Sequence, residues 1–194
     1  MPMDIDDEKT RLRKMLRERR KQAFAAHDGA AGALAERLAE VPLPGKAATV
    51  AGYVAHGSEI DPLPALKELA ARGYDLCLPV VVAPGRPLAF RNWAEGMALE
   101  SGEFDIPVPA ATVDEITPDV VLVPLIGFDR AGGRLGQGGG FYDRTLPLLR
   151  AANPSLLAIG LAFSVQEVAS VPRADNDAAL DWIVTERETI GIHS

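Results

Sequence analysis

The residues best placed to do chemistry lie in a glycine-rich segment, residues 127–146, which reads GFDRAGGRLGQGGGFYDRTL. The segment follows an apolar run and precedes a predicted helix, so it is expected at the carboxyl end of a strand, where open parallel sheets bind ligands. Glycines let several backbone N–H groups face one anion, and a helix N-terminus adds donors and a positive dipole end. The segment is therefore predicted to hold a phosphate group, with a purely structural glycine turn as the alternative.

This segment does not follow the common phosphate-binding patterns. A P-loop ends in Gly-Lys-Ser or Gly-Lys-Thr, whereas Gly140 is followed by Phe141. The dinucleotide fingerprint also fails, because its last glycine would have to stand where Phe141 stands. Arg134 and Arg144 flank the glycines and can bind phosphate oxygens through two N–H groups each. Asp143 is either a Mg²⁺ ligand beside the phosphates or an ordinary acid in the first helical turn.

Charge is distributed unevenly along the 194 residues, whose formal net charge is −7. Residues 1–22 contain eight Lys or Arg and five Asp or Glu, a net charge of +3, which leaves −10 for the rest. A basic stretch on an acidic body favours a small, highly charged ligand such as a nucleotide, because the body repels a long polyanion. Lys9 and Arg13 are four residues apart and project from one face of a predicted helix. The alternative is a solvated surface helix.

Composition limits the kind of metal and the compartment. A single cysteine, Cys77, excludes an internal disulfide and cysteine-based zinc sites, so any metal is expected to be a hard cation on carboxylates. No apolar run has the length of a membrane span, and the N-terminal residues do not resemble a signal peptide. The protein is therefore expected to be cytoplasmic, without a membrane partner.

The elements that must position these residues alternate between helices and strands. Helices are predicted over residues 8–27, 29–40, 62–72 and 141–152. Strands are predicted over residues 48–54, 74–82, 87–93 (an edge strand), 119–128, 155–163 and 181–185, with 94–118 as loop. Strand–helix–strand crossovers favour parallel pairing. The predicted fold is α/β, with three layers and a mostly parallel central sheet covered by helices on both faces, in one domain spanning 1–194 and including the basic helix 8–27.

The run VPLIGFDRAGGRLGQGGGFYDRTL, residues 123–146, resembles the signature of the 5-formyltetrahydrofolate cyclo-ligases, also called 5,10-methenyltetrahydrofolate synthetases. The family pattern is Val-Pro, Phe-Asp, then Arg-Leu-Gly-x-Gly-Gly-Gly-Tyr-Tyr-Asp-Arg. An N-terminal Lys-x-x-x-Arg pair, a Tyr…Glu segment and a late Gln, Pro and Asp series extend the resemblance over nearly the whole chain. The matching residues are Lys9, Arg13, Tyr53 to Glu59, Gln166, Pro172, Asp177 and Asp181.

The resemblance implies an enzyme that uses ATP and Mg²⁺ to close 5-formyltetrahydrofolate to 5,10-methenyltetrahydrofolate, with release of ADP and phosphate. Phosphorylation turns the formyl oxygen into a leaving group, and N10 then attacks the same carbon. This reaction requires no protein nucleophile and depends on positioning and charge neutralisation. The resemblance further implies a fold similar to the sugar-phosphate isomerase and CoA-transferase group. We expect a monomer with a small-molecule substrate and no nucleic-acid partner.

The family's functional residues transfer position by position. Implied ATP-binding residues are Lys9, Arg13, Arg134, Leu135, Gly136, Gln137, Gly138, Gly139, Gly140, Phe141 and Tyr142. Implied catalytic residues are Arg134, Tyr142 and Asp143, and implied Mg²⁺ ligands are Asp143 and Asp177. Implied substrate-binding residues are Val54, Glu59, Trp93 and Tyr142. Glu59 can accept two N–H bonds from the pterin edge, whereas Trp93 either stacks on the ligand or is an ordinary aromatic residue.

Three positions depart from the family pattern. Gln137 stands where Tyr is frequent, Phe141 replaces the first Tyr of Tyr-Tyr-Asp, and Asn176 stands where His is usual. These changes affect fine geometry and rate more than the class of reaction.

Three other functions remain open. A sugar-phosphate isomerase would use Glu59 as a base, and a folate-binding protein would bind without turnover. RNA binding would use the remaining basic residues of the N-terminal stretch, for which a solvated helix face is the preferred interpretation. Those residues are Arg17, Arg19, Arg20 and Lys21.

Overall fold

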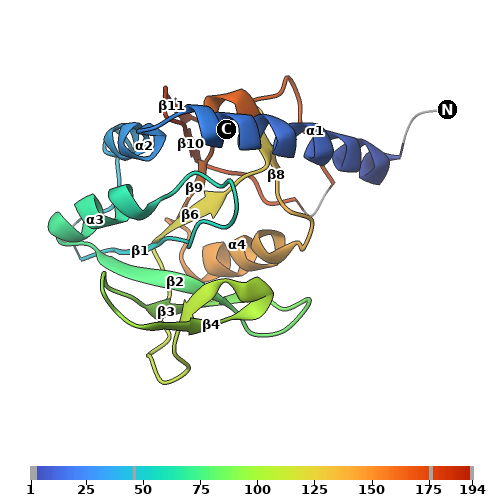
Figure 1. Cartoon of the computed structure of the whole chain (residues 1–194). Coiled ribbons are helices and arrows are strands. Elements are labelled where there is room, and N and C mark those ends of the chain that lie inside the picture. Colours follow the sequence, from blue (N-terminus) through green and yellow to red (C-terminus); the bar gives the residue numbers. More distant parts are fainter. Residues whose placement is uncertain (1–3, 46, 175–176, 193–194) are drawn as a thin grey trace.

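A computed structural model describes residues 4–45, 47–174 and 177–192, and its centre is a seven-stranded sheet (Figure 1). In spatial order the strands are β11 (Thr189–Gly191), β10 (Trp182–Val184), β9 (Leu157–Leu161), β6 (Val120–Pro124), β1 (Thr49–Ala51), β2 (Asp75–Val81) and β3 (Leu88–Asn92). The five inner strands pair in parallel, and only the two edge strands, β3 and β11, run antiparallel to their neighbours. The predicted mostly parallel sheet, with an edge strand at 87–93, is confirmed.

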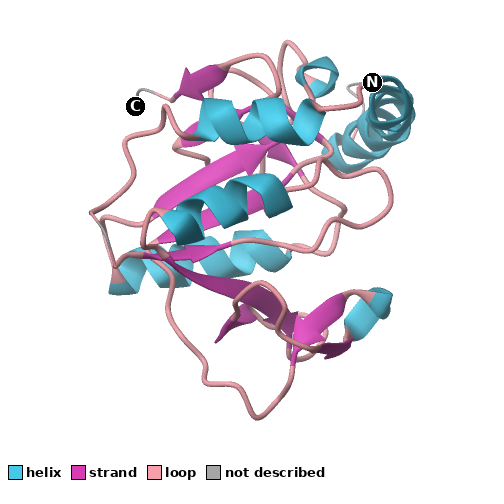
Figure 2. Cartoon of the chain, turned by 60° about the vertical axis from the view of Figure 1, so that its left-hand side comes forward, coloured by secondary structure: helices cyan, strands magenta, loops and turns pink. Residues whose placement is uncertain are grey.

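Helices cover both faces of the sheet, as Figure 2 shows. They are α1 (Ile5–Ala26), α2 (Ala30–Leu38), α3 (Leu63–Ala71) and α4 (Phe141–Ala152). Successive strand residues point to opposite faces. Val120 packs with α2 and α3 in one core cluster, and the next residue, Val121, packs with α4 in another. The predicted three-layer α/β fold is therefore confirmed.

Several predicted boundaries differ from the structure. The apolar run 119–128 is not one strand, because it breaks after β6 and resumes as β7 (Gly127–Phe128), which pairs with β8 (Arg134–Leu135). The prediction of loop over 94–118 is wrong, since this region holds the hairpin β4 (Leu99–Ser101) and β5 (Pro107–Pro109) with the short 3₁₀ helix η1 (Glu103–Asp105). Prolines favour the loop prediction, but a two-stranded ribbon has free edges where a missing N–H costs nothing.

Helix α1 begins at Ile5, earlier than predicted, because the Asp4 carboxylate caps it by accepting the Asp6 N–H at 3.3 Å. Leu16, fully buried, anchors the middle of the helix in a cluster with Ile126, Leu135 and Val171. The helix passes so close to β7 that a Cβ atom on Gly127 would overlap the Leu16 side chain. A glycine in β7 thus allows α1 to lie directly on the sheet end (Figure 1).

Replacement of Leu16 by alanine tests this anchor. Leu16→Ala is expected to lower the free energy of unfolding by about 2–5 kcal/mol, because it leaves a cavity beneath α1. Urea unfolding measures this loss, and amide hydrogen exchange should show faster exchange in α1. The matched control is Met15→Ala, at a side chain that is 41% exposed, with an expected change within about 0.5 kcal/mol. Equal unfolding midpoints for the two variants would contradict the anchoring role.

Candidate functional site

Three loops meet at one edge of the sheet because they follow three neighbouring parallel strands. The sheet order places β6 between β9 and β1. Residues 52–62 follow β1, residues 125–140 follow β6, and residues 162–181 follow β9. Carboxyl ends of parallel strands share one edge, which is where open α/β sheets bind ligands. Helix α1 reaches all three loops, through residues on its buried side.

The N-terminal half of α1 contacts the loops after β6 and β9. Lys9 Nζ donates to Asp177 Oδ2 at 2.5 Å, and Arg13 Nε donates to the Gly136 carbonyl at 3.0 Å. Lys9 and Arg13 were predicted to share a helix face, and they do: Arg13 contacts the glycine loop and Lys9 contacts the loop after β9. The basic stretch therefore packs against the acidic body in this region.

The C-terminal half of α1 contacts the loop after β1. Arg17 donates to Gln137 Oε1 at 3.1 Å, and Gln137 Nε2 donates to Glu59 Oε1 at 3.3 Å. Arg20 Nη1 lies 3.6 Å from the same Glu59 oxygen. Arg20 is buried, so its interpretation as part of a solvated face is wrong, whereas Arg19 is exposed as expected. Helical periodicity places Arg20 on the buried side with Leu16, and this signal is present in the sequence.

Glu59 is buried, with 7% of its surface exposed. Its Oε2 atom accepts the His56 backbone N–H at 3.0 Å, while Oε1 faces Gln137 and Arg20. A carboxylate has about four acceptor positions. Glu59 therefore retains capacity for N–H donors of a ligand while the protein fixes its orientation.

Arg134 and Asp143 form an ion pair on the other side of the glycine loop. Arg134 Nε also donates to the Ala178 carbonyl at 2.9 Å, and the Ala178 N–H donates to Asp143 Oδ1 at 3.2 Å. Burial lowers the pKa of Arg134, and the charges of Asp143 and Asp177 oppose that shift. The buried arginine stays charged, because its pKa starts far above neutral.

Asp143 and Asp177 fit a Mg²⁺ ion that also binds phosphates. Among the described residues, hydrogen bonds reach only the Oδ2 atom of Asp177 and only the Oδ1 atom of Asp143. The second oxygen of each carboxylate is therefore free of hydrogen bonds from these residues. Burial opposes ionisation of Asp177, but the Lys9 and Ala174 donors outweigh it and hold the pKa below its usual value. No cluster of three His, Cys, Asp or Glu ligands occurs within the described ranges. Mg²⁺ does not need one, since it commonly takes one or two carboxylates and completes its shell with phosphate and water.

The glycine loop ends at an uncapped helix. Gly138 and Gly140 have φ values of 108° and 64°, which favour glycine, and Gly140 precedes α4 without a side-chain cap. The first N–H groups of α4 are consequently available to an anion. Arg144 donates to the Gly139 carbonyl at 2.6 Å and lies 5.3 Å from the centre of the Phe141 ring, so it braces the loop.

Two aromatic residues complete this region. Burial, followed by the charge of Glu59, raises the pKa of the Tyr142 phenol, so its hydroxyl remains a proton donor at neutral pH. Phe104, exposed at the tip of the β4–β5 hairpin, packs edge-on against Phe141 at 6.3 Å between ring centres. Phe104 was not predicted to lie here, because the pairing of β4 with β5 that brings it to Phe141 has no signal in the local sequence.

The chain is similar to known proteins in both sequence and structure. The model described as the 5-formyltetrahydrofolate cyclo-ligase family matches residues 5–186. The chain belongs to the 5-formyltetrahydrofolate cyclo-ligase family. It is 34% identical over 185 residues to the 5-formyltetrahydrofolate cyclo-ligase of Mycolicibacterium smegmatis, covering 91% of this chain and 92% of the relative. It is 32% identical over 178 residues to that of Escherichia coli K12, covering 88% and 96%.

A solved structure supports the same conclusion. The NMR structure of Aquifex aeolicus 5,10-methenyltetrahydrofolate synthetase superposes with a TM-score of 0.80 at 27% identity. The superposition covers 96% of this chain and 93% of the Aquifex chain. The resemblance stated from the sequence is thus confirmed as membership of the cyclo-ligase family, and the predicted ligand roles of single residues stay predictions.

Two predicted substrate residues of this cyclo-ligase chain take no part in the polar side-chain contacts above. Val54 is half-buried and belongs to the loop after β1, the same chain segment that contains Glu59. Trp93 donates its backbone N–H to the Leu76 carbonyl at 2.9 Å, and its ring packs against the core under α2 and α3. Its buried indole N–H donates to no protein group in the described part of the chain. Asn176, the third departure from the family pattern, lies outside the described residues.

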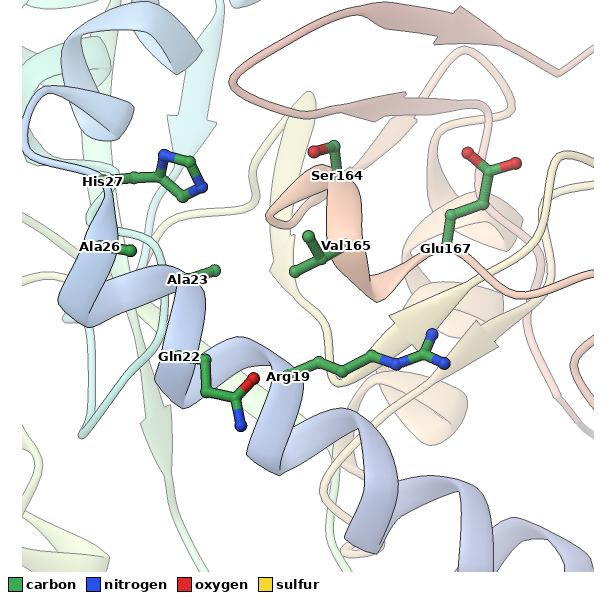
Figure 3. A pocket seen from close by; sticks show the side chains of 8 residues that line it. All are labelled: Arg19, Gln22, Ala23, Ala26, His27, Ser164, Val165 and Glu167. Carbon is green, nitrogen blue, oxygen red and sulfur yellow. The ribbon is translucent and has the colours of Figure 1, made fainter.

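A groove of about 570 Å³ lies along another side of α1, with a lining that differs from the candidate site described above (Figure 3). Figure 3 shows Val165 pointing towards the helix from η2 (Ser164–Gln166). The groove is lined by Arg19, Gln22, Ala23, Ala26, His27, Ser164, Val165 and Glu167. None of these residues was predicted to bind ATP, Mg²⁺ or folate. Across the residues that are described, no helix has the length and apolar character of a membrane span.

Asp129 has a structural role that was not predicted, although it stands in the Phe-Asp part of the family signature. Its carboxylate accepts the N–H groups of Ala131, Gly133 and Val171 at 3.0, 2.8 and 2.8 Å, and pairs with Arg173 at 3.0 Å. Burial would raise the pKa of Asp129, but these N–H donors and Arg173 outweigh it and lower the pKa. Asp129 therefore fixes the first turn of the glycine loop.

Asp129→Asn is expected to lower the free energy of unfolding by at least about 2 kcal/mol at neutral pH, because an amide leaves buried donors unsatisfied. Since the pKa is lower in the folded state, the advantage of the wild type is full above the ordinary Asp pKa of about 4 and shrinks as the pH falls below it. Urea unfolding between about pH 7 and about pH 3 measures both effects. Asp114→Asn, at an exposed carboxylate, is the control. An advantage that grows on acidification would contradict the assignment.

Proposed function

We propose that this protein catalyses the ATP- and Mg²⁺-dependent closure of 5-formyltetrahydrofolate to 5,10-methenyltetrahydrofolate. The observation that carries the proposal is the contact of α1 with two loops: Arg13 bonds Gly136 in the glycine loop, and Lys9 bonds Asp177 in the loop after β9. This contact brings two cations, a glycine loop and an uncapped helix N-terminus to one place. Such a set of donors suits a triphosphate. One chain supplies every residue involved, so a monomer suffices.

The phosphate end of the site would hold ATP. Lys9, Arg13 and Arg134 supply positive charge, and Gly138 to Gly140 and the start of α4 supply N–H donors. Asp143 and Asp177 would bind Mg²⁺ through their free oxygens, and the bound ion would neutralise phosphate charge during transfer. Lys9 and Arg134 orient these carboxylates, because each bonds one of them.

The other end of the site would hold the folate. Glu59 lies beside Gln137 and beside Arg20 of the basic helix, and it can accept N–H donors of the pterin ring. Val54 supplies an apolar surface beside it, and the Tyr142 hydroxyl remains a donor near the same carboxylate. Trp93 is retained as a candidate for stacking on the ligand. Together these residues would place the formyl oxygen towards the γ-phosphate.

The chemistry then needs positioning rather than a protein nucleophile. The formyl oxygen attacks the γ-phosphorus of ATP, and ADP leaves with the electrons of the broken P–O bond. N10 next attacks the formyl carbon, loses its proton, and closes the ring as the former formyl oxygen departs with phosphate. Cys77 takes no part, because it is buried in the core and burial raises the pKa of its thiol to about 12.

Purified protein is expected to form the methenyl product, followed by its absorbance, in equal amounts with ADP when given 5-formyltetrahydrofolate, ATP and Mg²⁺. Omission of ATP or of Mg²⁺ should abolish product formation. Folate binding without ADP release would favour a binding protein, and isomerisation of a sugar phosphate without ATP would favour an isomerase. The proposal would be overturned by either of these results if no methenyl product forms at saturating ATP.

Asp143→Asn is expected to lower turnover at least about 100-fold, since it weakens a Mg²⁺ ligand and also breaks the charged pair that orients Arg134. Steady-state assays over a range of Mg²⁺ concentrations should show the loss largest at low Mg²⁺. Glu100→Gln removes an exposed carboxylate and serves as the control, with unchanged turnover. Turnover within two-fold of wild type for both variants would remove Asp143 from the proposed role.

A further inference from the structure

Arg20 is a buried cation that ATP binding does not explain. Its side chain is 7% exposed, close to the 9% of Glu59, its only acidic partner among the described residues. A buried charge is costly unless it is paired and hydrogen-bonded. Burial lowers the pKa of Arg20, and the charge of Glu59 opposes this shift. The position of Arg20 therefore depends on Glu59, in the folate half of the site.

The Arg20 guanidinium spans two positions in the loop that follows β1. Its Nε donates to Ser58 Oγ at 3.1 Å, and its Nη1 lies 3.6 Å from Glu59 Oε1. Nη1 makes no hydrogen bond within the described ranges, so its interaction with Glu59 is one of charge. The planar fork of arginine can face both residues at once, which a lysine ammonium does less well.

Three groups surround the Glu59 carboxylate from three different parts of the chain. The His56 backbone N–H belongs to its own loop, Gln137 belongs to the glycine loop, and Arg20 belongs to α1. Of the three, only Arg20 brings a positive charge. A neutral N–H edge of a ligand brings no charge to Glu59. Among these three groups, Arg20 is therefore the one that can balance the negative charge of the carboxylate.

We infer that Arg20 is a positioning residue for the folate substrate: it balances and orients the Glu59 carboxylate so that its free lone pairs face the N–H edge of the pterin ring. This inference rests on the proposed function, because it takes Glu59 as the folate ligand. It also gives a purpose to a cation that lies beyond the pair expected at the phosphates. Arg20 acts through Glu59 and does not contact the reacting atoms.

The test measures two affinities in the full-length protein by calorimetry, one for 5-formyltetrahydrofolate and one for a non-hydrolysable ATP analogue with Mg²⁺. Arg20→Met is expected to weaken folate binding at least about 30-fold, as when one partner of a buried charge pair is removed. Binding of the ATP analogue should change less than about two-fold. Arg20→Lys should recover part of the folate affinity, because it restores the charge. Arg19→Met, one residue away on the exposed side, should bind both ligands as wild type does.

A double-mutant cycle separates positioning from a merely structural role. In a Glu59→Gln background, Arg20→Met should cause little further loss of folate affinity, because no carboxylate remains to be oriented. The same loss in both backgrounds, or a parallel fall in ATP-analogue affinity, would overturn the inference. If Arg20→Met does not fold, Arg20→Lys carries the same cycle with a smaller expected loss. Wild-type protein that binds no folate would overturn the proposed function and this inference together, whereas unchanged folate binding by a folded Arg20→Met variant would overturn the inference alone.

Discussion

The packing of Leu16 beneath α1 holds the cations of this helix at the end of the sheet. Leu16 lies against β7 at Gly127, where no side chain keeps the helix away. One turn before it and one turn after it, Arg13 and Arg20 face the same side. Together with Leu12 and the buried Ala23 of the same helix, Leu16 sets the register of the basic helix against three loops. Because a helix keeps its residues in fixed relative positions, correct placement of Leu16 places Lys9 and Arg20 as well.

The acids of the site are paired with cations in the folded protein itself. Lys9 pairs with Asp177, Arg134 with Asp143, and Arg20 lies beside Glu59. Charges removed from water need partners, and each of these carboxylates has a cation beside it. Asp143 and Asp177 each keep an oxygen that accepts no hydrogen bond from the described residues, and the proposed binding of Mg²⁺ relies on these two oxygens. The net charge of −7 hides this local balance.

Much of the site was predictable, because its signals are local. The glycine spacing indicated a loop between a strand and a helix, and the Lys9 and Arg13 spacing indicated one helix face. The fold class followed from alternating helices and strands. The short strands were harder, since β4, β5, β7 and β8 are two or three residues long and owe their pairing to neighbours rather than to their own pattern. Pro107 and Pro109 argued for loop at a place where a free ribbon edge tolerates them.

By itself, the sequence determined the α/β class, the glycine loop, the family and the set of charged residues available to bind a phosphorylated ligand. Only the tertiary structure decided which of these charges meet. Arg19 and Arg20 are adjacent and chemically identical, yet one is exposed and the other is buried beside Glu59, far away along the chain. Composition and local spacing cannot report such a pairing, because it depends on how α1 packs across loops from three strands. Asp129 shows the same limit, since its partners Val171 and Arg173 come from a distant loop.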